Sequence, residues 1–262
     1  MSETAADILL RSDENGIATL TLNRVEARNA LSMGLMAALI NELKELGRDP
    51  SVKVVVLAAN GPAFCAGHDL RELQSDPTAE AYEAVFQRCA TLMMTITRLP
   101  KPVIAKVHAM ATAAGCQLVA TCDLAIAADC AKFATPGVNI GLFCSTPMVA
   151  LTRAVGRKAA MEMLLTGQPI HAVEAERIGL VNRVVNPVQL DKAVEDLASI
   201  IAAKSSYTLA VGKEAFYRQA EMGLDEAYAY ASAVMVKNML ADDATEGIDA
   251  FINKRHPVWR GC

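Results

Sequence analysis

Two short segments of the chain have the residue types needed to present backbone N–H groups to a ligand. One spans residues 61–70 and the other spans residues 108–118, and both are rich in glycine and alanine. Small side chains let a ligand approach the backbone closely, and the start of a helix adds partial positive charge. The two segments are therefore candidate sites for close approach of a ligand to the backbone, although tight turns with close helix packing would require the same residue types.

Several reactive side chains lie within or near these segments. The imidazole of His68 could carry a proton near neutral pH or simply line a pocket, and we favour the second role. Ser145 and Thr146 could bind a polar group, but we expect them to cap a helix that begins at Pro147. Buried cysteines behave mostly as small apolar residues, so we expect no nucleophile among three of them. These three are Cys65, Cys116 and Cys144.

The expected secondary structure places both small-residue segments directly after buried strands. Apolar runs at residues 54–58, 103–107 and 124–127 are rich in β-branched residues, which is typical of strands covered on both faces. The first segment follows the first of these strands, and the second segment connects the next strand to a helix. The middle of the chain is therefore expected to have β/α architecture.

The flanking regions have their own signals. Asn15-Gly16 between runs 8–11 and 17–22 predicts a β-hairpin, and Ser32 predicts the N-cap of a helix that ends at Asp49-Pro50. Beyond Pro136 the pattern is mostly helical, with one later strand candidate at residues 180–185. Helices are expected at residues 147–155, 157–166, 172–178, 188–203, 207–221 and 225–240.

Five segments resemble, in order, the signature segments of the enoyl-CoA hydratase/isomerase (crotonase) superfamily. They are residues 23–31, 63–70, 101–105, 115–123 and 246–255. The resemblance implies an α/β fold, a crotonase (ClpP-like) ββα spiral with a C-terminal helical trimerisation region. It implies a spiral core with the CoA and oxyanion site at residues 1–203, and a helical oligomerisation region at residues 204–262. A homotrimer, or a hexamer made from two trimers, is the implied assembly.

The resemblance also implies a CoA thioester as substrate and roles for particular residues. The backbone N–H groups of His68 and Ala114 correspond to the family's two oxyanion donors, and Lys254 would reach a CoA phosphate bound to a neighbouring subunit. Arg28 is a second candidate for the phosphates. No separate cofactor and no metal are expected. The full set of implied substrate-binding residues is Arg28, Ala63, Phe64, Ala66, Asp69 and Lys254.

Both catalytic glutamates of the family's hydratases are replaced in this chain. Gln117 occupies the first position and Gly137 the second, and neither an amide nor a glycine can exchange a proton as a carboxylate does. Three alternatives remain open. One is a crotonase with shifted or ligand-supplied acid and base groups, in which a space beside Gly137 admits water, bicarbonate or a substrate group. The second is an acyl-CoA-binding protein with little or no turnover, or a non-catalytic oligomeric interaction protein. The third is a residual hydratase or isomerase that uses another carboxylate such as Asp69.

Composition excludes some other classes of function. A net charge of −4 gives no general attraction to nucleic acid, and charges interrupt the apolar runs, so no membrane insertion is expected. Seven cysteines without a C-x-x-C pair indicate reduced thiols. Residues 1–10 have no basic residue and so do not resemble a secretory or transit peptide. These features predict a cytoplasmic protein.

Overall fold

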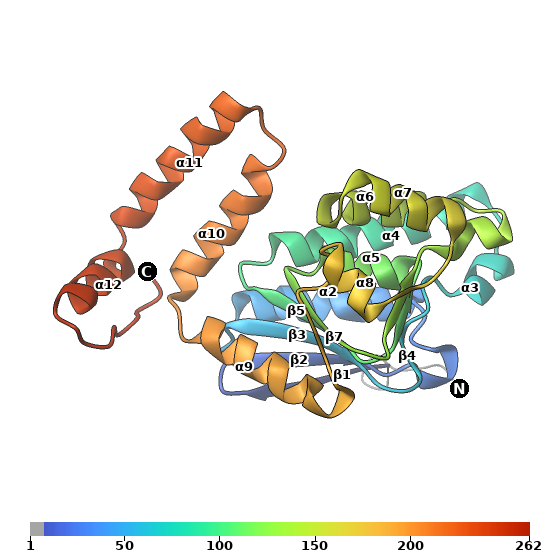
Figure 1. The fold of residues 1–262 in the computed structure, drawn as a ribbon, viewed down its shortest axis with the longest axis horizontal. Coiled ribbons are helices and arrows are strands. Elements are labelled where there is room, and N and C mark those ends of the chain that lie inside the picture. The colour runs from blue at the N-terminus through green and yellow to red at the C-terminus, as the bar shows by residue number, and fades with distance from the viewer. Residues whose placement is uncertain (1–7) are drawn as a thin grey trace.

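The computed structural model describes residues 8–262, and it is built around two β-sheets (Figure 1). Residues 1–7, which hold most of the segment tested for a targeting signal, lie outside the described residues. The larger sheet contains, in spatial order, β1 (Leu9–Glu14), β2 (Ile17–Leu22), β3 (Val54–Ala59), β5 (Val103–Val107), β7 (Leu124–Ala128) and β10 (Arg183–Val185). The smaller sheet contains β4 (Ala63–Cys65), β6 (Met110–Thr112), β8 (Lys132–Ala134) and β9 (Ile170–His171).

The first two strands form the hairpin that the sequence predicts. β1 pairs antiparallel with β2, while β2, β3, β5, β7 and β10 are parallel. Asn15 and Gly16 both have positive φ, 52° and 77°, which is the backbone conformation of a tight turn that matches strand twist. The hairpin prediction is confirmed, and it sets the edge of the larger sheet.

Helices cover both faces of the larger sheet. α2 (Met33–Arg48), α4 (Ala79–Arg98) and α5 (Ala114–Thr121) pack on one face, and α9 (Leu190–Ala202) packs on the other. Alternate residues of β3 divide between the two cores, since Val55 belongs to the first and Val54 and Val56 belong to the second. The apolar runs are therefore strands covered on both faces, as the sequence predicts.

Successive turns of the chain repeat one pattern. A strand of the larger sheet leads to a short strand of the smaller sheet and then to a helix, as in β5, β6 and α5. This is the ββα spiral that the sequence predicts. The other helices described before residue 204 are α3 (Leu70–Ser75), α6 (Ser145–Ala154), α7 (Arg157–Thr166) and α8 (Ala172–Arg177). Three short 3-10 turns complete this part of the chain: η1 (Val25–Ala27), η2 (Pro136–Ile140) and η3 (Pro187–Gln189).

Two capping predictions have different outcomes. The hydroxyl of Ser32 accepts the N–H of Leu35 at 3.1 Å, so the predicted N-cap of α2 is confirmed. The prediction that Ser145 and Thr146 cap a helix starting at Pro147 is wrong. α6 starts at Ser145 itself, its N-cap is Cys144, and the hydroxyl of Ser145 donates to the carbonyl of Phe143 instead. Proline at the third helical position was mistaken for the helix start.

The helices beyond the predicted boundary at residue 204 project away from the sheets as an arm (Figure 1). The arm consists of α10 (Ser206–Gln219), α11 (Leu224–Met239), α12 (Asp242–Ile252) and the tail that follows. Lys213 of α10 anchors it to the body, because its ammonium donates to Asp123 at 2.6 Å and to two backbone carbonyls. The tail folds back so that the indole N–H of Trp259 donates to the carbonyl of Ala203 at 2.9 Å.

Candidate functional site

The first candidate donor, the N–H of His68, lies in a turn that is bonded to the segment before α2. Leu31 donates its N–H to Gly67 at 2.7 Å and accepts the N–H of Asp69 at 3.3 Å. In such a parallel bridge the residue between the two partners turns its own backbone groups to the opposite side. The N–H of His68 therefore points away from Leu31, and it has no acceptor within residues 8–262.

The second candidate donor, the N–H of Ala114, is the first residue of α5. A first-turn N–H has no acceptor within its own helix. Ala113, the N-cap, has φ 50° and ψ −119°, a conformation that costs an alanine about 1–3 kcal/mol and is typical of functional turns. Its own N–H is tied to the carbonyl of Ala134 at 2.9 Å. The strained turn thus leaves the N–H of Ala114 free at the end of the helix.

Two glycines bring these donors together. A Cβ atom on Gly67, whose φ is 94°, would lie 3.4 Å from the amide nitrogen of Ala114 and 2.9 Å from the Cβ of Ala113. A Cβ atom on Gly115 would collide with the backbone carbonyl of Cys65. Glycine at both positions therefore permits the close backbone approach that sequence analysis expects of the two segments. Two adjacent free N–H groups can stabilise a developing oxyanion by about 3–4 kcal/mol each.

A buried asparagine and an ion pair support this arrangement. The amide of Asn29 donates to the carbonyls of Asn60 and Ala63, both at 2.8 Å. The carboxylate of Asp69 caps α3 by accepting the N–H of Arg71 at 3.1 Å, and it pairs with Arg24 at 3.1 Å. Both oxygens of Asp69 are thus engaged in holding the turn that contains His68.

The predicted CoA-binding residues lie along β4. β4 is the edge strand of the smaller sheet, so one row of its backbone groups faces away from β6. The side chain of Phe64 is fully buried, whereas the backbone of Ala66 donates to Arg28 and accepts from the hydroxyl of Thr112, both at 3.0 Å. The side chain of Arg28 is exposed and has no hydrogen-bond partner within the described residues. Lys254 is exposed and follows α12, a helix of the arm that lies far from β4 in Figure 1.

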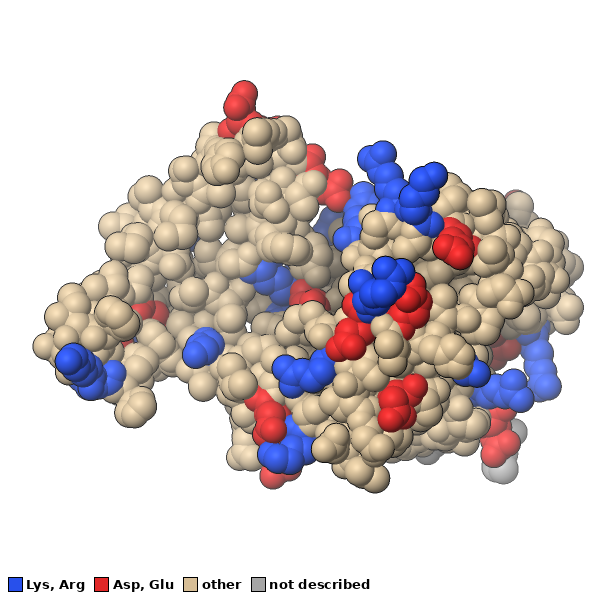
Figure 2. Space-filling view, viewed as in Figure 1, with Lys and Arg blue, Asp and Glu red and all other residues tan. Residues whose placement is uncertain are grey.

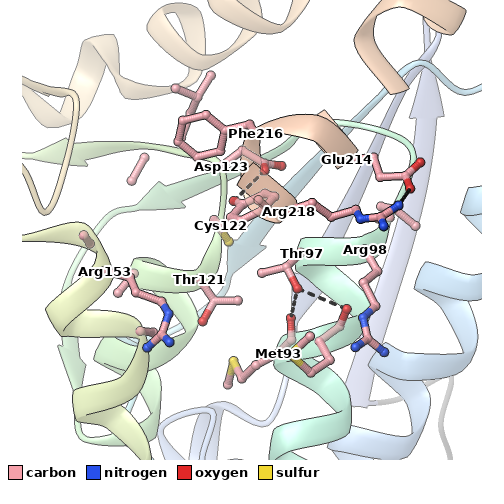
Figure 3. A pocket seen from close by; sticks show the side chains of 18 of the residues that line it. Met93, Thr97, Arg98, Thr121, Cys122, Asp123, Arg153, Glu214, Phe216 and Arg218 are labelled. Atoms are coloured by element: carbon pink, nitrogen blue, oxygen red, sulfur yellow. Dashed lines mark hydrogen bonds and ion pairs between the residues drawn. The ribbon is translucent and has the colours of Figure 1, made fainter. Parts of the chain in front are cut away.

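Gln117 is one of the residues that line a groove of about 1140 Å³ between the body and α10, and His68, Ala114 and Gly137 are not among them. Figure 3 shows Arg153 and Arg98 on opposite sides of this groove. Gln117 is 5% exposed, and its carbonyl oxygen accepts the thiol of Cys89 at 3.8 Å. Its amide side chain is therefore a buried polar group at the bottom of the groove.

The position that a side chain at Gly137 would occupy is filled. A Cβ atom on Gly137 would lie 2.6 Å from the carbonyl oxygen of Leu142 and 2.9 Å from the sulfur of Cys144. The N–H of Gly137 donates to that sulfur at 3.3 Å, and its carbonyl accepts the N–H of Leu142 at 2.9 Å. Residues 138–144 therefore occupy the direction that a side chain at Gly137 would take, and the entry of water, bicarbonate or a substrate group beside this residue stays a prediction.

Burial decides the chemical state of the other candidates. It raises the pKa of the Cys65 and Cys116 thiols to about 12, so both remain protonated and poorly nucleophilic at neutral pH. It lowers the pKa of His68, which keeps the imidazole neutral. Within the described residues neither buried ring nitrogen has a hydrogen bond of good geometry, but the backbone of Leu31 acts on the imidazole and partly offsets the effect of burial on its pKa. The ring packs edge-on against Phe86 at 5.5 Å between centroids.

Thr135 is a residue of this region that sequence analysis did not single out. Its side chain is fully buried, and its hydroxyl has no hydrogen-bond partner within the described residues. Only its place two residues before Gly137 could have drawn attention to it. An unpaired buried hydroxyl costs about 1–3 kcal/mol, so its presence requires an explanation.

A ββα spiral that carries two free backbone amides side by side defines a protein of the crotonase class. The chain belongs to the enoyl-CoA hydratase/isomerase family, whose model matches residues 12–262. Residues 111–120 and 133–147 resemble the branch called enoyl-CoA hydratase domain-containing protein 3, and this prediction is confirmed. The chain is 48% identical to that protein of Rattus norvegicus over 246 residues, which cover 94% of this chain and 82% of the relative.

Solved structures of relatives confirm the predicted fold. A crystal structure of an enoyl-CoA hydratase from Mycobacterium smegmatis is 55% identical with a TM-score of 0.94, and it covers 96% of this chain and 98% of that one. Human enoyl-CoA hydratase domain-containing protein 3 is 45% identical with the same TM-score, over 96% of this chain and 100% of that one. The C-terminal helices are part of this similarity.

The predicted cytoplasmic location is wrong. The similar proteins from rat, mouse and human are all named as mitochondrial. The prediction failed because free cysteines fit any reducing compartment, so they do not distinguish between two such compartments. Among residues 8–262, no helix is both long and apolar enough to cross a bilayer.

Proposed function

We propose that this protein binds acyl-CoA thioesters and holds the thioester oxygen on the N–H groups of His68 and Ala114. The observation that carries the proposal is the contact between the turn at Gly67 and the start of α5, where both N–H groups lack acceptors. Negative charge that develops on the oxygen, as in an enolate, is stabilised by such preorganised donors. The names of the relatives, which include enoyl-CoA hydratases, support a CoA thioester as the substrate.

The nucleotide end of CoA is proposed to lie along the free edge of β4. Arg28 supports this placement. Its backbone carbonyl accepts the N–H of Ala66, and its guanidinium is exposed and has no hydrogen-bond partner within the described residues. Lys254 follows α12, which Figure 1 shows on the far side of the arm from β4, so it is proposed to reach the phosphates of a neighbouring subunit.

Hydration by the two-glutamate route is proposed to be orders of magnitude slower than in the family's hydratases. Gln117 and Gly137 cannot exchange protons. Asp69 is a poor substitute because both of its oxygens are engaged by Arg24 and Arg71. The proposed activity is therefore enolate chemistry on a thioester, of the lyase or isomerase type, with acid and base groups that differ from the family's pair.

Calorimetry with CoA, acetyl-CoA and crotonyl-CoA tests the binding proposal. Absence of binding by all three at millimolar concentration would refute it. The variant Ala114→Pro removes one proposed donor at the first position of α5, and because Ala113 before it has φ 50° and ψ −119°, circular dichroism is used to establish that the variant folds. It should abolish the extra affinity for acetyl-CoA over CoA, whereas Arg157→Pro at the start of α7 should preserve it. A crotonyl-CoA hydration rate in the normal range of two-glutamate hydratases would overturn the proposal on mechanism.

Self-association is also proposed, as a homotrimer or a hexamer of two trimers. Large apolar side chains are exposed along the arm, including Leu240 at 81% and Phe251 at 86%. Figure 2 shows that the arm has few charged side chains on the face in view. Exposed apolar surface of this kind marks interaction sites. Analytical ultracentrifugation should give a trimer or hexamer, and Phe251→Glu should shift it toward the monomer, whereas a monomeric wild-type protein would refute self-association.

A further inference from the structure

Three buried polar atoms without hydrogen bonds among residues 8–262 belong to residues at or near the proposed oxyanion donors. They are the two ring nitrogens of His68 and the hydroxyl oxygen of Thr135. Within residues 8–262 only one other side-chain atom shares this condition, the amide oxygen of Asn238 on the arm. Because most buried polar groups in proteins are paired, a cluster at one site indicates that a ligand supplies the missing partner.

Both side chains belong to residues that flank the amide pair. His68 itself carries one of the two N–H groups. Thr135 follows β8, and the last residue of β8, Ala134, accepts the N–H of Ala113 at 2.9 Å and pairs with Thr112 in the sheet register. Thr135 is therefore the neighbour of Ala113 and Ala114 across the smaller sheet.

Besides the backbone of Leu31, which acts on the imidazole, apolar residues lie close to these side chains. Phe64 on β4, Ala111 on β6 and Phe133 on β8 are fully buried apolar residues of the smaller sheet. The imidazole of His68 contacts the ring of Phe86. In an apolar site, a few placed polar groups decide which ligand is accepted. A ligand with an apolar acyl chain would leave all three atoms unpaired.

We propose that the side chains of His68 and Thr135 are specificity-determining residues that hydrogen-bond a neutral oxygen substituent, a hydroxyl or keto group, on the acyl chain near the thioester. This inference rests on the proposed function, because the amide pair must first hold the thioester oxygen. The neutral imidazole offers one donor and one acceptor, and the threonine hydroxyl offers both. A carboxylate substituent would fit poorly, since no described cation pairs with either side chain.

Calorimetry with CoA, butyryl-CoA, 3-hydroxybutyryl-CoA and succinyl-CoA tests the proposal. At least one enantiomer of the hydroxy compound should bind the wild-type protein about tenfold or more tightly than butyryl-CoA, and succinyl-CoA should gain nothing. Thr135→Val should reduce this preference while leaving affinity for butyryl-CoA unchanged, because both backbone donors remain. His68→Phe should also reduce the preference, measured as the ratio of the two affinities, because His68 itself contributes one of the donors. His171→Gln, on an exposed histidine, is the matched control.

The outcomes separate this inference from the function on which it rests. If CoA and butyryl-CoA fail to bind, the proposed function is wrong. If both bind, but the hydroxy compound binds no better than butyryl-CoA, only the specificity inference is overturned. Thermal unfolding gives a second readout, because Thr135→Val removes no hydrogen bond and should leave Tm unchanged or raised. A clear fall in Tm would mean that the hydroxyl has a structural partner, which would also overturn the inference.

Discussion

Adding a side chain at Gly137 should disturb the fold before it affects any chemistry. The Cβ atom of Gly137→Ala would lie 2.6 Å from the carbonyl oxygen of Leu142, 0.4 Å inside the 3.0 Å limit that real Cβ contacts respect. That oxygen belongs to backbone held by the bond from the N–H of Leu142 to Gly137, so it cannot swing aside as a flexible side chain could. The φ of Gly137 is not positive, so the effect is purely steric.

Overpacking of this kind costs about 1–3 kcal/mol. For a chain of this size, that loss lowers Tm by roughly 2–12 °C. Thermal unfolding followed by circular dichroism measures it directly. Gly156→Ala is the matched control, because nothing lies within 4 Å of the added Cβ and the backbone there is already extended. Its Tm should change by less than about 2 °C.

The same geometry determines what a restored glutamate would do. Gly137→Glu, alone or with Gln117→Glu, should displace residues 138–144 and reduce stability without creating a hydratase. Cys144→Ala should rescue little of this loss, because the nearest obstacle is the backbone of Leu142 and not the thiol. A stable Gly137→Glu variant that hydrates crotonyl-CoA would refute the reasoning, since it would show that the site still has room for a second carboxylate.

Three other changes test separate parts of the structure. Gly115→Ala should push α5 off β4 and abolish acetyl-CoA binding in calorimetry, whereas Gly212→Ala in the open part of α10 should stabilise the protein slightly. Lys213→Met should reduce the free energy of unfolding by about 3–5 kcal/mol in urea titrations, because it leaves the carboxylate of Asp123 without its cation. Because the pKa of His68 is lowered in the folded protein, its imidazole is protonated below about pH 6.5 in the unfolded chain but stays neutral to lower pH in the folded chain. Stability should therefore fall as the pH drops from 7 to 5, and His68→Phe should lose less over that range; an equal loss in both proteins would contradict the buried, neutral imidazole.

Sequence patterns predicted those parts of the fold that depend on neighbours along the chain. The Asn15-Gly16 turn, the Ser32 cap and the doubly covered strands follow from local conformation and from continuous apolar runs. The longest helix of the body, α4, was not predicted, because its buried stripe is narrow and is separated by polar residues. The smaller sheet was missed for a related reason, since strands of two or three residues are too short to show a period.

The candidate site was predictable only where it depends on backbone. Glycine and alanine at positions 67, 114 and 115 indicate close approach, and the geometry explains why those types are needed. The closed surroundings of Gly137 could not be predicted, because the obstructing carbonyl belongs to a residue with no distinctive side-chain chemistry. Thr135 was equally hidden, since an unpaired hydroxyl is recognised only when every possible partner in space has been located.

The arm is fastened at both of its attachments to the body. Lys213 and Tyr217 of α10 share the carboxylate of Asp123, and Trp259 returns to the linker at Ala203. An arm held this way loses little conformational entropy when its apolar face meets another subunit. Preorganisation of this kind lowers the free-energy cost of association, so more of the buried apolar area contributes to net affinity. Loosening the arm should therefore weaken assembly even where no interface residue has changed.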